Sequence, residues 1–104
     1  MNRCPILKVA VIEDGRLGVF PADTCASYQY VYRAAAGVYW DDGASCFKST
    51  PPHDWSYTQW YKHIHSVVRD EVGLTMVLTP STIFEAEESG FSDDIRMADQ
   101  ELRG

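Results

Sequence analysis

The fold of this chain is decided by residues 55–74, which read WSYTQWYKHIHSVVRDEVGL. Ser56 and Gln59 have the spacing of a capping box, in which two side chains satisfy the free backbone N–H groups at the start of a helix. Trp55 and Trp60 flank this box at the two positions of a hydrophobic staple, which fixes the direction in which the chain enters the helix. These residues therefore predict that a helix begins at this point.

The same stretch carries one apolar stripe at helical spacing. Its members are Tyr57, Trp60, Tyr61, Ile64, Val67 and Val68. Gly73 follows the stripe where a left-handed C-terminal cap belongs. Because the caps, the spacing and the composition agree, the sequence predicts an amphipathic helix over residues 57–72.

Strand patterns lie on both sides of this helix. Residues 6–13 and 16–20 are apolar runs separated by Asp-Gly, which is a strong hairpin signal. Residues 38–40 and 44–48 flank a second turn of sequence Asp-Asp-Gly and are expected to pair with each other. After the helix, residues 74–79 predict a short strand that ends before a proline.

The last quarter of the chain leaves two interpretations open. Residues 82–86 can form one more strand, or Thr79 can cap a helix that has Pro80 as its first residue. Further on, Ser92 can cap a last helix. The apolar residues at helical spacing in that segment are Ile95, Ala98 and Leu102.

Together these elements predict an α+β fold, with an antiparallel meander sheet of about five strands packed on one amphipathic helix. The chain has 104 residues, of which 45% are hydrophobic, so it can form one ordered core. We assign residues 1–86 to this α+β domain. Residues 87–104 form an acidic segment that belongs either to the same domain or to a tail.

Residues 27–40 also have the pattern of a strand, with a bulge or bend at Gly37. Tyr28, Tyr30 and Tyr32 alternate along it and would share one face. This tyrosine row is either core covered by the helix or a surface that binds a ligand or a partner, since tyrosine tolerates half-burial with its hydroxyl in water. The full candidate surface consists of Tyr28, Tyr30, Tyr32, Tyr39, Trp40, Trp60 and Glu71.

Glu71 belongs to this set because its helical angle places it within the apolar stripe. Its side chain either reaches solvent where the helix ends or is a partly buried carboxylate. In the second case, Arg33 or a tyrosine hydroxyl would be its partner.

The net charge of −6 is unevenly distributed along the chain. Residues 85–104 hold seven acids and two bases, whereas residues 1–84 are nearly balanced. The acids that could form a partner surface are Glu85, Glu87, Glu88, Asp93 and Asp94. Acidic segments accelerate association with basic partners through long-range electrostatic attraction. The sequence has no cluster of basic residues, so direct binding to nucleic acid is not expected. Removal of residues 87–104 is expected to weaken partner binding while the core stays folded.

Histidines and cysteines supply only weak metal candidates, namely His53, His63, His65 and Cys46. His63 and His65 would point about 200° apart on a helix, so they cannot hold one ion within it. No metal or cofactor is expected. Three cysteines do not make a closed disulfide framework, and no apolar run has the length of a membrane span, so we expect a cytoplasmic protein that does not enter a membrane.

These features favour a small acidic binding protein without catalytic function. One form of it is an inhibitor or immunity-type protein that masks a basic surface of a protein partner, and a homo-oligomer is a further possibility. The alternative is a small-molecule-binding domain with an aromatic-lined pocket. A metal- or thiol-dependent enzyme is the third hypothesis.

Overall fold

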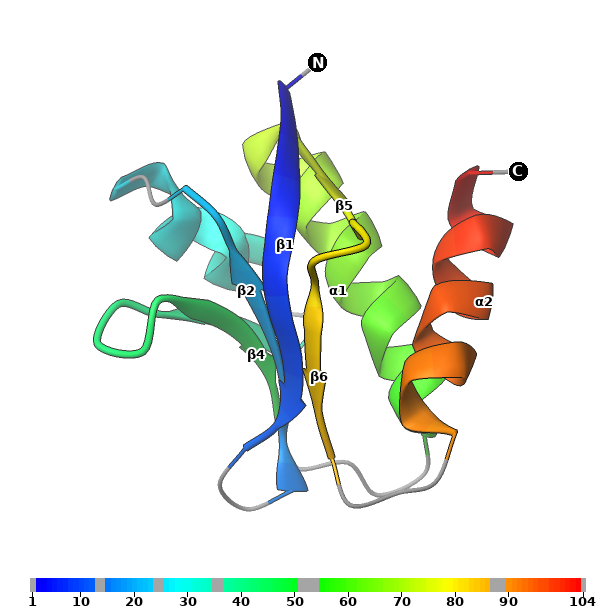
Figure 1. The fold of residues 1–104 in the computed structure, drawn as a ribbon. Helices are drawn as coiled ribbons and strands as arrows, with labels where there is room; N and C mark the ends of the chain where they lie inside the picture. The colour runs from blue at the N-terminus through cyan, green and yellow to red at the C-terminus, as the bar shows by residue number, and fades with distance from the viewer. Residues whose placement is uncertain are drawn as a thin grey trace.

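The computed structural model describes residues 2–12, 15–23, 26–34, 37–50, 55–86 and 90–103. Its strands are β1 (Asn2–Val11), β2 (Leu17–Pro21), β3 (Val38–Asp41), β4 (Cys46–Ser49), β5 (Leu74–Val77) and β6 (Ile83–Glu85). Its helices are the 3₁₀ helix η2 (Ala26–Ala34) and the α-helices α1 (Tyr57–Val72) and α2 (Phe91–Arg103). A curled mixed sheet packs against the helices, so the α+β class is confirmed (Figure 1).

The helix predicted over residues 57–72 is confirmed as α1. Ser56 accepts a hydrogen bond from the backbone N–H of Gln59, and the side chain of Gln59 accepts one from the backbone N–H of Ser56, which completes the capping box. The rings of Trp55 and Trp60 pack with their centroids 4.8 Å apart, as the staple requires. Gly73 ends the helix in the left-handed conformation, with φ of 69°.

The sheet has the strand order β3-β4-β2-β1-β5, and β6 pairs with the second half of β1. The first four strands do not form the predicted meander, because β2 pairs with β4 rather than with β3. The predicted antiparallel pairing is correct for β1 to β4, where both hairpins form. It is wrong for β5 and β6, which run parallel to β1. The reason is that α1 carries the chain back along the sheet before β5 begins, and a crossover of this kind produces a parallel pair.

The segment between β5 and β6 interrupts what would otherwise be one edge strand. Both strands run beside β1, and the chain between them turns through Pro80, which cannot donate a ladder hydrogen bond. The side chain of Thr82 replaces the missing ladder contact, because its hydroxyl donates to the backbone oxygen of Ile6 at 2.7 Å. The same hydroxyl accepts from the backbone N–H of Thr79 at 2.9 Å.

Replacing Thr82 with Val is expected to destabilise the fold by about 1–3 kcal/mol, because the isosteric side chain leaves the carbonyl of Ile6 buried without its donor. Urea unfolding of the purified variant measures this loss. Thr82→Ser is the matched control and should retain most of the stability. Equal stability of Thr82→Val and wild type would show that the hydrogen bond is dispensable.

The strand pattern predicted over residues 27–40 is correct only at its end, in β3, and is wrong before that, since Ala26–Ala34 form the 3₁₀ helix η2. The period-two tyrosine pattern is misleading here because Tyr28 and Val31, three residues apart, are the buried positions. A spacing of three places side chains on one side of a 3₁₀ helix. Burial of this pair against β3 and α1 therefore selects the helical turn over the strand.

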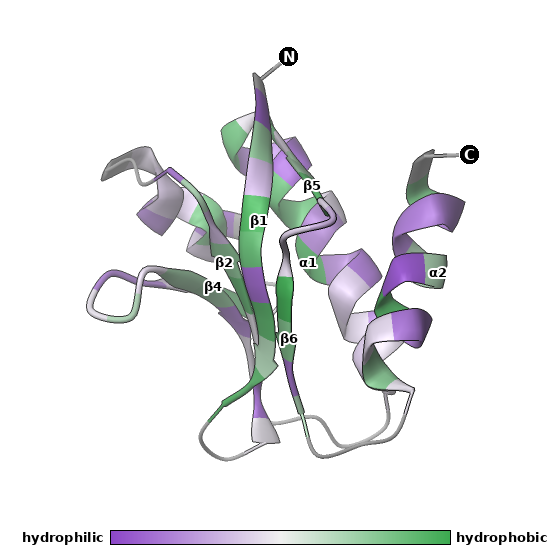
Figure 2. Ribbon diagram, in the orientation of Figure 1, coloured by the Kyte–Doolittle hydropathy of each residue, from purple (hydrophilic) through white to green (hydrophobic). Residues whose placement is uncertain are grey.

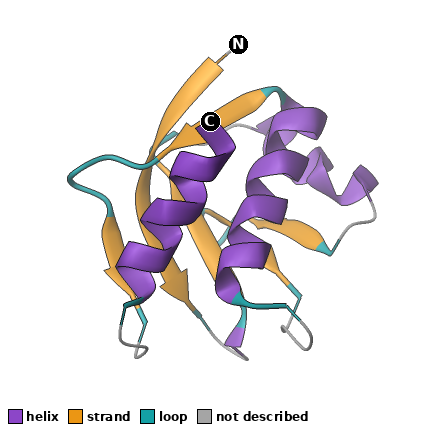
Figure 3. Ribbon diagram, turned by 90° about the vertical axis from the view of Figure 1, so that its right-hand side faces the viewer, coloured by secondary structure: helices purple, strands orange, loops and turns teal. Residues whose placement is uncertain are grey.

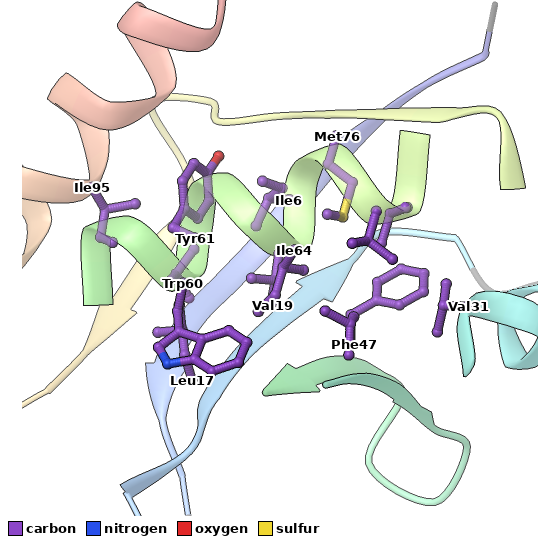
Figure 4. Close-up of a cluster of buried hydrophobic side chains, with 14 of the residues drawn as sticks. Ile6, Leu17, Val19, Val31, Phe47, Trp60, Tyr61, Ile64, Met76 and Ile95 are labelled. Carbon is purple, nitrogen blue, oxygen red and sulfur yellow. The ribbon is translucent and has the colours of Figure 1, made fainter. Parts of the chain in front are cut away.

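One hydrophobic core lies between the sheet and the helices (Figure 4). Val19 from the sheet and Ile64 from α1 lie in the middle of the cluster as drawn, between Tyr61 on one side and Phe47 on the other. Helix α2 also contributes, through the buried side chains of Phe91, Ile95 and Ala98. Figure 3 shows α1 and α2 side by side over one face of the sheet, and Figure 2 shows hydrophilic residues along much of α2.

Candidate functional site

The predicted tyrosine row does not form a single face. Tyr28 is only 6% exposed and packs edge-on against Trp40, with ring centroids 5.1 Å apart. Its ring also contacts Phe47 at 5.2 Å. Trp60 is likewise buried, beneath Trp55. The aromatic rings at Tyr28, Trp40 and Trp60 are thus part of the packed interior or its margin.

Two of the tyrosines lie on the outside of η2 and form a surface with Arg33. Tyr32 is 58% exposed and Tyr30 is 38% exposed. The guanidinium of Arg33 lies over the ring of Tyr30, 4.2 Å from its centroid. We call Tyr30, Tyr32 and Arg33 the η2 surface. The position of the η2 surface is fixed by Tyr28 and Val31, whose side chains are buried in the core on the other side of η2.

Tyr39 and Glu71 do not belong to the η2 surface. Tyr39 is exposed and opposes Lys48 in the sheet, whereas its neighbour Trp40 opposes Phe47 on the side that packs against Tyr28. Tyr39 therefore points to the opposite face of the sheet. Glu71 is exposed in the last turn of α1, so its side chain reaches solvent rather than being a partly buried carboxylate.

Several of the acids at the end of the chain have partners within the fold. Glu85 pairs with Lys8 at 3.6 Å, and Glu101 pairs with Lys62 across a groove between α1 and α2. Asp99 is buried and accepts a hydrogen bond from the hydroxyl of Tyr61 at 2.9 Å.

Asp93 and Asp94 are exposed in the first turn of α2, where the helix dipole favours negative charge. These two carboxylates are the part of the predicted acidic surface that faces solvent on a described helix. Glu87 and Glu88 lie outside the described residues, as does His53.

Asp41, at the turn between β3 and β4, is held in its charged form. The ammonium of Lys48 donates to its carboxylate at 3.0 Å, and the backbone N–H of Ala44 donates at 3.1 Å. These hydrogen bonds, that from Lys48 foremost, lower the pKa of Asp41 below its usual value.

Asp41 should therefore add to stability above its unfolded-state pKa of about 3.9, and this contribution should disappear as pH falls through the lower pKa of the folded state. We expect Asp41→Asn to lower stability modestly at pH 7 and to flatten the fall in stability as pH decreases below about 4. Thermal unfolding across this range measures the effect. Asp42→Asn in the same turn is the control, and an unchanged acid profile in Asp41→Asn would contradict the expectation.

The weak metal candidates are dispersed by the fold. The ring of His63 lies against Trp55, with centroids 5.0 Å apart, whereas His65 is buried on the side of α1 that faces β5. Cys46 is fully buried in β4. In the described part of the chain, no three His, Cys, Asp or Glu side chains come together in a way that could hold a metal ion.

A pocket that the sequence does not predict lies where β1, β5 and the last turns of both α-helices meet. Its volume is about 350 Å³. Its lining residues are Arg3, His65, Arg69, Thr75, Met76, Val77 and Leu102. We call this site the arginine pocket. Arg3 and Arg69 are distant in sequence and both line this pocket. The parallel pairing of β1 with β5 places Arg3 opposite Thr75, which also lines it.

The wall of the arginine pocket is fixed by a hydrogen bond between an α1 side chain and the β5 backbone. Nε2 of the buried His65 lies 3.0 Å from the carbonyl oxygen of Met76. Because a carbonyl can only accept, this ring nitrogen carries the hydrogen. The bond joins α1 to β5 at the wall of the pocket.

No α-helix in the described ranges is long and apolar enough to cross a membrane.

Comparisons with known proteins show a similarity to integron cassette proteins. The family model described as Integron Cassette Protein Hfx_Cass5 matches residues 5–82. A solved structure from the mobile metagenome of North West Arm Sewage Outfall, the integron cassette protein Hfx_Cass5, is 26% identical to this chain. The similarity covers 96% of this chain and 98% of that one, with a TM-score of 0.46. No curated protein matches.

Proposed function

This chain belongs to the Hfx_Cass5 family of integron cassette proteins, and we propose that it is a small non-enzymatic binding protein that docks on a basic surface of a protein partner. An inhibitor or immunity-type protein would act in this way. The reducing cytoplasm is the location that we propose, because three cysteines do not make a closed disulfide framework. The observation that carries the proposal is the η2 surface.

The η2 surface has the composition of a protein-binding hot spot. Tyrosine and arginine are among the residues that contribute most to binding energy at interfaces. Here two tyrosines are exposed on an anchored segment, so little ordering is needed when a partner covers them. The stacking of Arg33 on Tyr30 also holds both side chains in one arrangement before binding.

The charge of the protein supports a basic partner. The net charge is −6, and Asp93 and Asp94 project from the start of α2. A field of this sign accelerates the approach of a positively charged protein. In this proposal the acids increase the association rate and the η2 surface supplies most of the binding energy.

The test is capture of proteins from a lysate of the native host, with the tagged full chain as bait. Wild type is compared with the double variant Tyr30→Ala/Tyr32→Ala. The matched control is Tyr39→Ala, which removes an exposed tyrosine from the opposite face of the sheet. A protein retained by wild type and by the control, and lost from the double variant, supports the proposal. The same proteins on all three baits would refute it.

The charge contribution is tested on the partner obtained in this way. Asp93→Asn/Asp94→Asn should slow association several-fold at low salt and leave dissociation nearly unchanged, as expected for a steering effect. The difference should vanish at high ionic strength. An identical association rate at low salt would remove the acids from the proposal. A partner that proves to be a second copy of the chain would make the η2 surface a homodimer interface.

The alternative function is a small-molecule-binding domain. It is supported by the arginine pocket and not by the aromatic-lined pocket that the sequence predicts. The rings of Tyr28, Trp40 and Phe47 pack on each other at 4.8–5.2 Å and occupy the region where an aromatic pocket was expected. The arginine pocket is the feature that favours a small ligand.

A further inference from the structure

The arginine pocket is the place where positive charge gathers in an acidic protein. Two of the nine basic residues of the chain line it, and none of its lining residues is an aspartate or glutamate. Elsewhere in the described structure, Lys8, Lys48 and Lys62 each pair with a carboxylate. Arg33 and Arg96 instead lie over aromatic rings. The pocket differs from these sites because two arginine side chains share one lining.

The guanidinium groups in the pocket have donors available for a ligand. Arg69 contacts Asp70 through Nε at 3.4 Å, and this pair is exposed and therefore weak. The two terminal nitrogens of Arg69 are not used by that contact. Arg3 forms no ion pair with any described residue. A planar guanidinium with free donors matches a carboxylate in bidentate geometry.

Apart from His65 and Thr75, the rest of the pocket lining is apolar. Met76, Val77 and Leu102 contribute its hydrophobic wall, which comes from β5 and the end of α2. Pockets for small ligands combine a predominantly apolar lining with a few placed polar groups. We propose that the arginine pocket binds a small organic anion, a carboxylate with a short apolar chain. The head group meets Arg3 and Arg69, and the chain lies against Leu102 and Val77.

The size and surroundings of the pocket select a small ligand over a polyanion. Its volume of about 350 Å³ lies near the lower end of the range for ligand sites. Proteins bind nucleic acid through many contacts between basic side chains and phosphates. Two arginines line this pocket, and the net charge of the chain is −6. The surrounding negative field repels a polymer of phosphates, while a single carboxylate can enter.

The experiment is a titration of the ¹⁵N-labelled full chain with hexanoate at low salt, followed by amide chemical shifts and by calorimetry. Acetate, 1-hexanol and inorganic phosphate are titrated in parallel. We expect saturable shifts at Arg3, Thr75 and Leu102, with hexanoate binding several-fold more tightly than acetate. Hexanol lacks the charge and phosphate lacks the chain, so both should bind more weakly than hexanoate.

Arg3→Gln and Arg69→Gln should each weaken hexanoate binding about tenfold, as expected for the loss of a charge-assisted hydrogen bond worth ~1.4 kcal/mol. The matched control is Arg33→Gln, which removes the same charge from the η2 surface and should bind like wild type. Thermal unfolding confirms that each variant is folded.

Three results would overturn the proposal. The first is the absence of saturable shifts at the pocket. The second is equal or tighter binding of hexanol or phosphate. The third is an equal loss of affinity in Arg33→Gln and Arg3→Gln, which would mean that only the overall charge matters. None of these results bears on partner capture by Tyr30 and Tyr32, so the pocket and the proposed function fail separately.

Discussion

Replacing Ile95 with Ala is expected to lower the free energy of unfolding by about 2–5 kcal/mol. Ile95 is fully buried in the core cluster, on the side of α2 that contacts α1 (Figure 4). The smaller side chain leaves a cavity that its neighbours cannot fill without moving. Urea unfolding monitored by tryptophan fluorescence measures the loss, because all three tryptophans lie in residues 40–60. A global transition that shifts to lower urea would show that α2 and the sheet unfold together.

Met97→Ala is the matched control on the same helix. Its side chain is 62% exposed, so the substitution should change stability by less than about 0.5 kcal/mol. If Ile95→Ala also changed the free energy of unfolding by less than about 0.5 kcal/mol, the packing of α2 would contribute little to the stability of the core. The burial of Phe91 and Ala98 on the same helix argues for the core.

This packing changes how the acidic C-terminal segment can be tested. Deleting residues 87–104 would remove Ile95 together with Asp99, which accepts a hydrogen bond from the buried Tyr61. A truncated chain could then lose partner binding merely because it is unfolded. The substitutions Asp93→Asn and Asp94→Asn avoid this problem, since both side chains are exposed.

The parts of the fold that the sequence predicts well are those with local physical causes. The capping box at Ser56, the Trp55–Trp60 staple and the Gly73 cap are all within a few residues of the helix ends they define. The two hairpins are likewise specified by short turns between apolar runs. In each case the interacting groups are neighbours in sequence, so their spacing carries the information.

The parts that the sequence does not predict depend on distant contacts. The 3₁₀ conformation of η2 results from burial of Tyr28 and Val31, three residues apart, against β3 and α1. The sequence pattern is misleading because the tyrosines in this segment occur at every second residue, which is the spacing of a strand. The arginine pocket is lined by Arg3 and Arg69, which are distant in sequence, and by Thr75, which the parallel register of β1 and β5 places opposite Arg3. No local motif surrounds either arginine, which is why both were missed as site residues.

The second large effect is expected at Tyr28, where Tyr28→Ala should cost about 3–5 kcal/mol. The ring is 6% exposed and packs on Trp40 and Phe47, so its loss opens a cavity beneath η2. Tyr32→Ala, two positions along the same 3₁₀ helix, should change stability by no more than about 0.5 kcal/mol, because Tyr32 faces solvent. Urea unfolding of the two variants under identical conditions gives the comparison.

Comparing the Tyr28 and Tyr32 variants distinguishes a residue that stabilises η2 from a residue that contacts the partner. If Tyr28 anchors the η2 surface, Tyr28→Ala should also weaken partner capture, to the extent that η2 is unfolded in this variant. Tyr28→Phe keeps the ring and should retain more stability and more partner capture than Tyr28→Ala. Tyr32→Ala should weaken capture with stability intact. A large loss of stability in Tyr32→Ala would place that residue in the structural framework, and recognition would then have to rest on Tyr30 and Arg33.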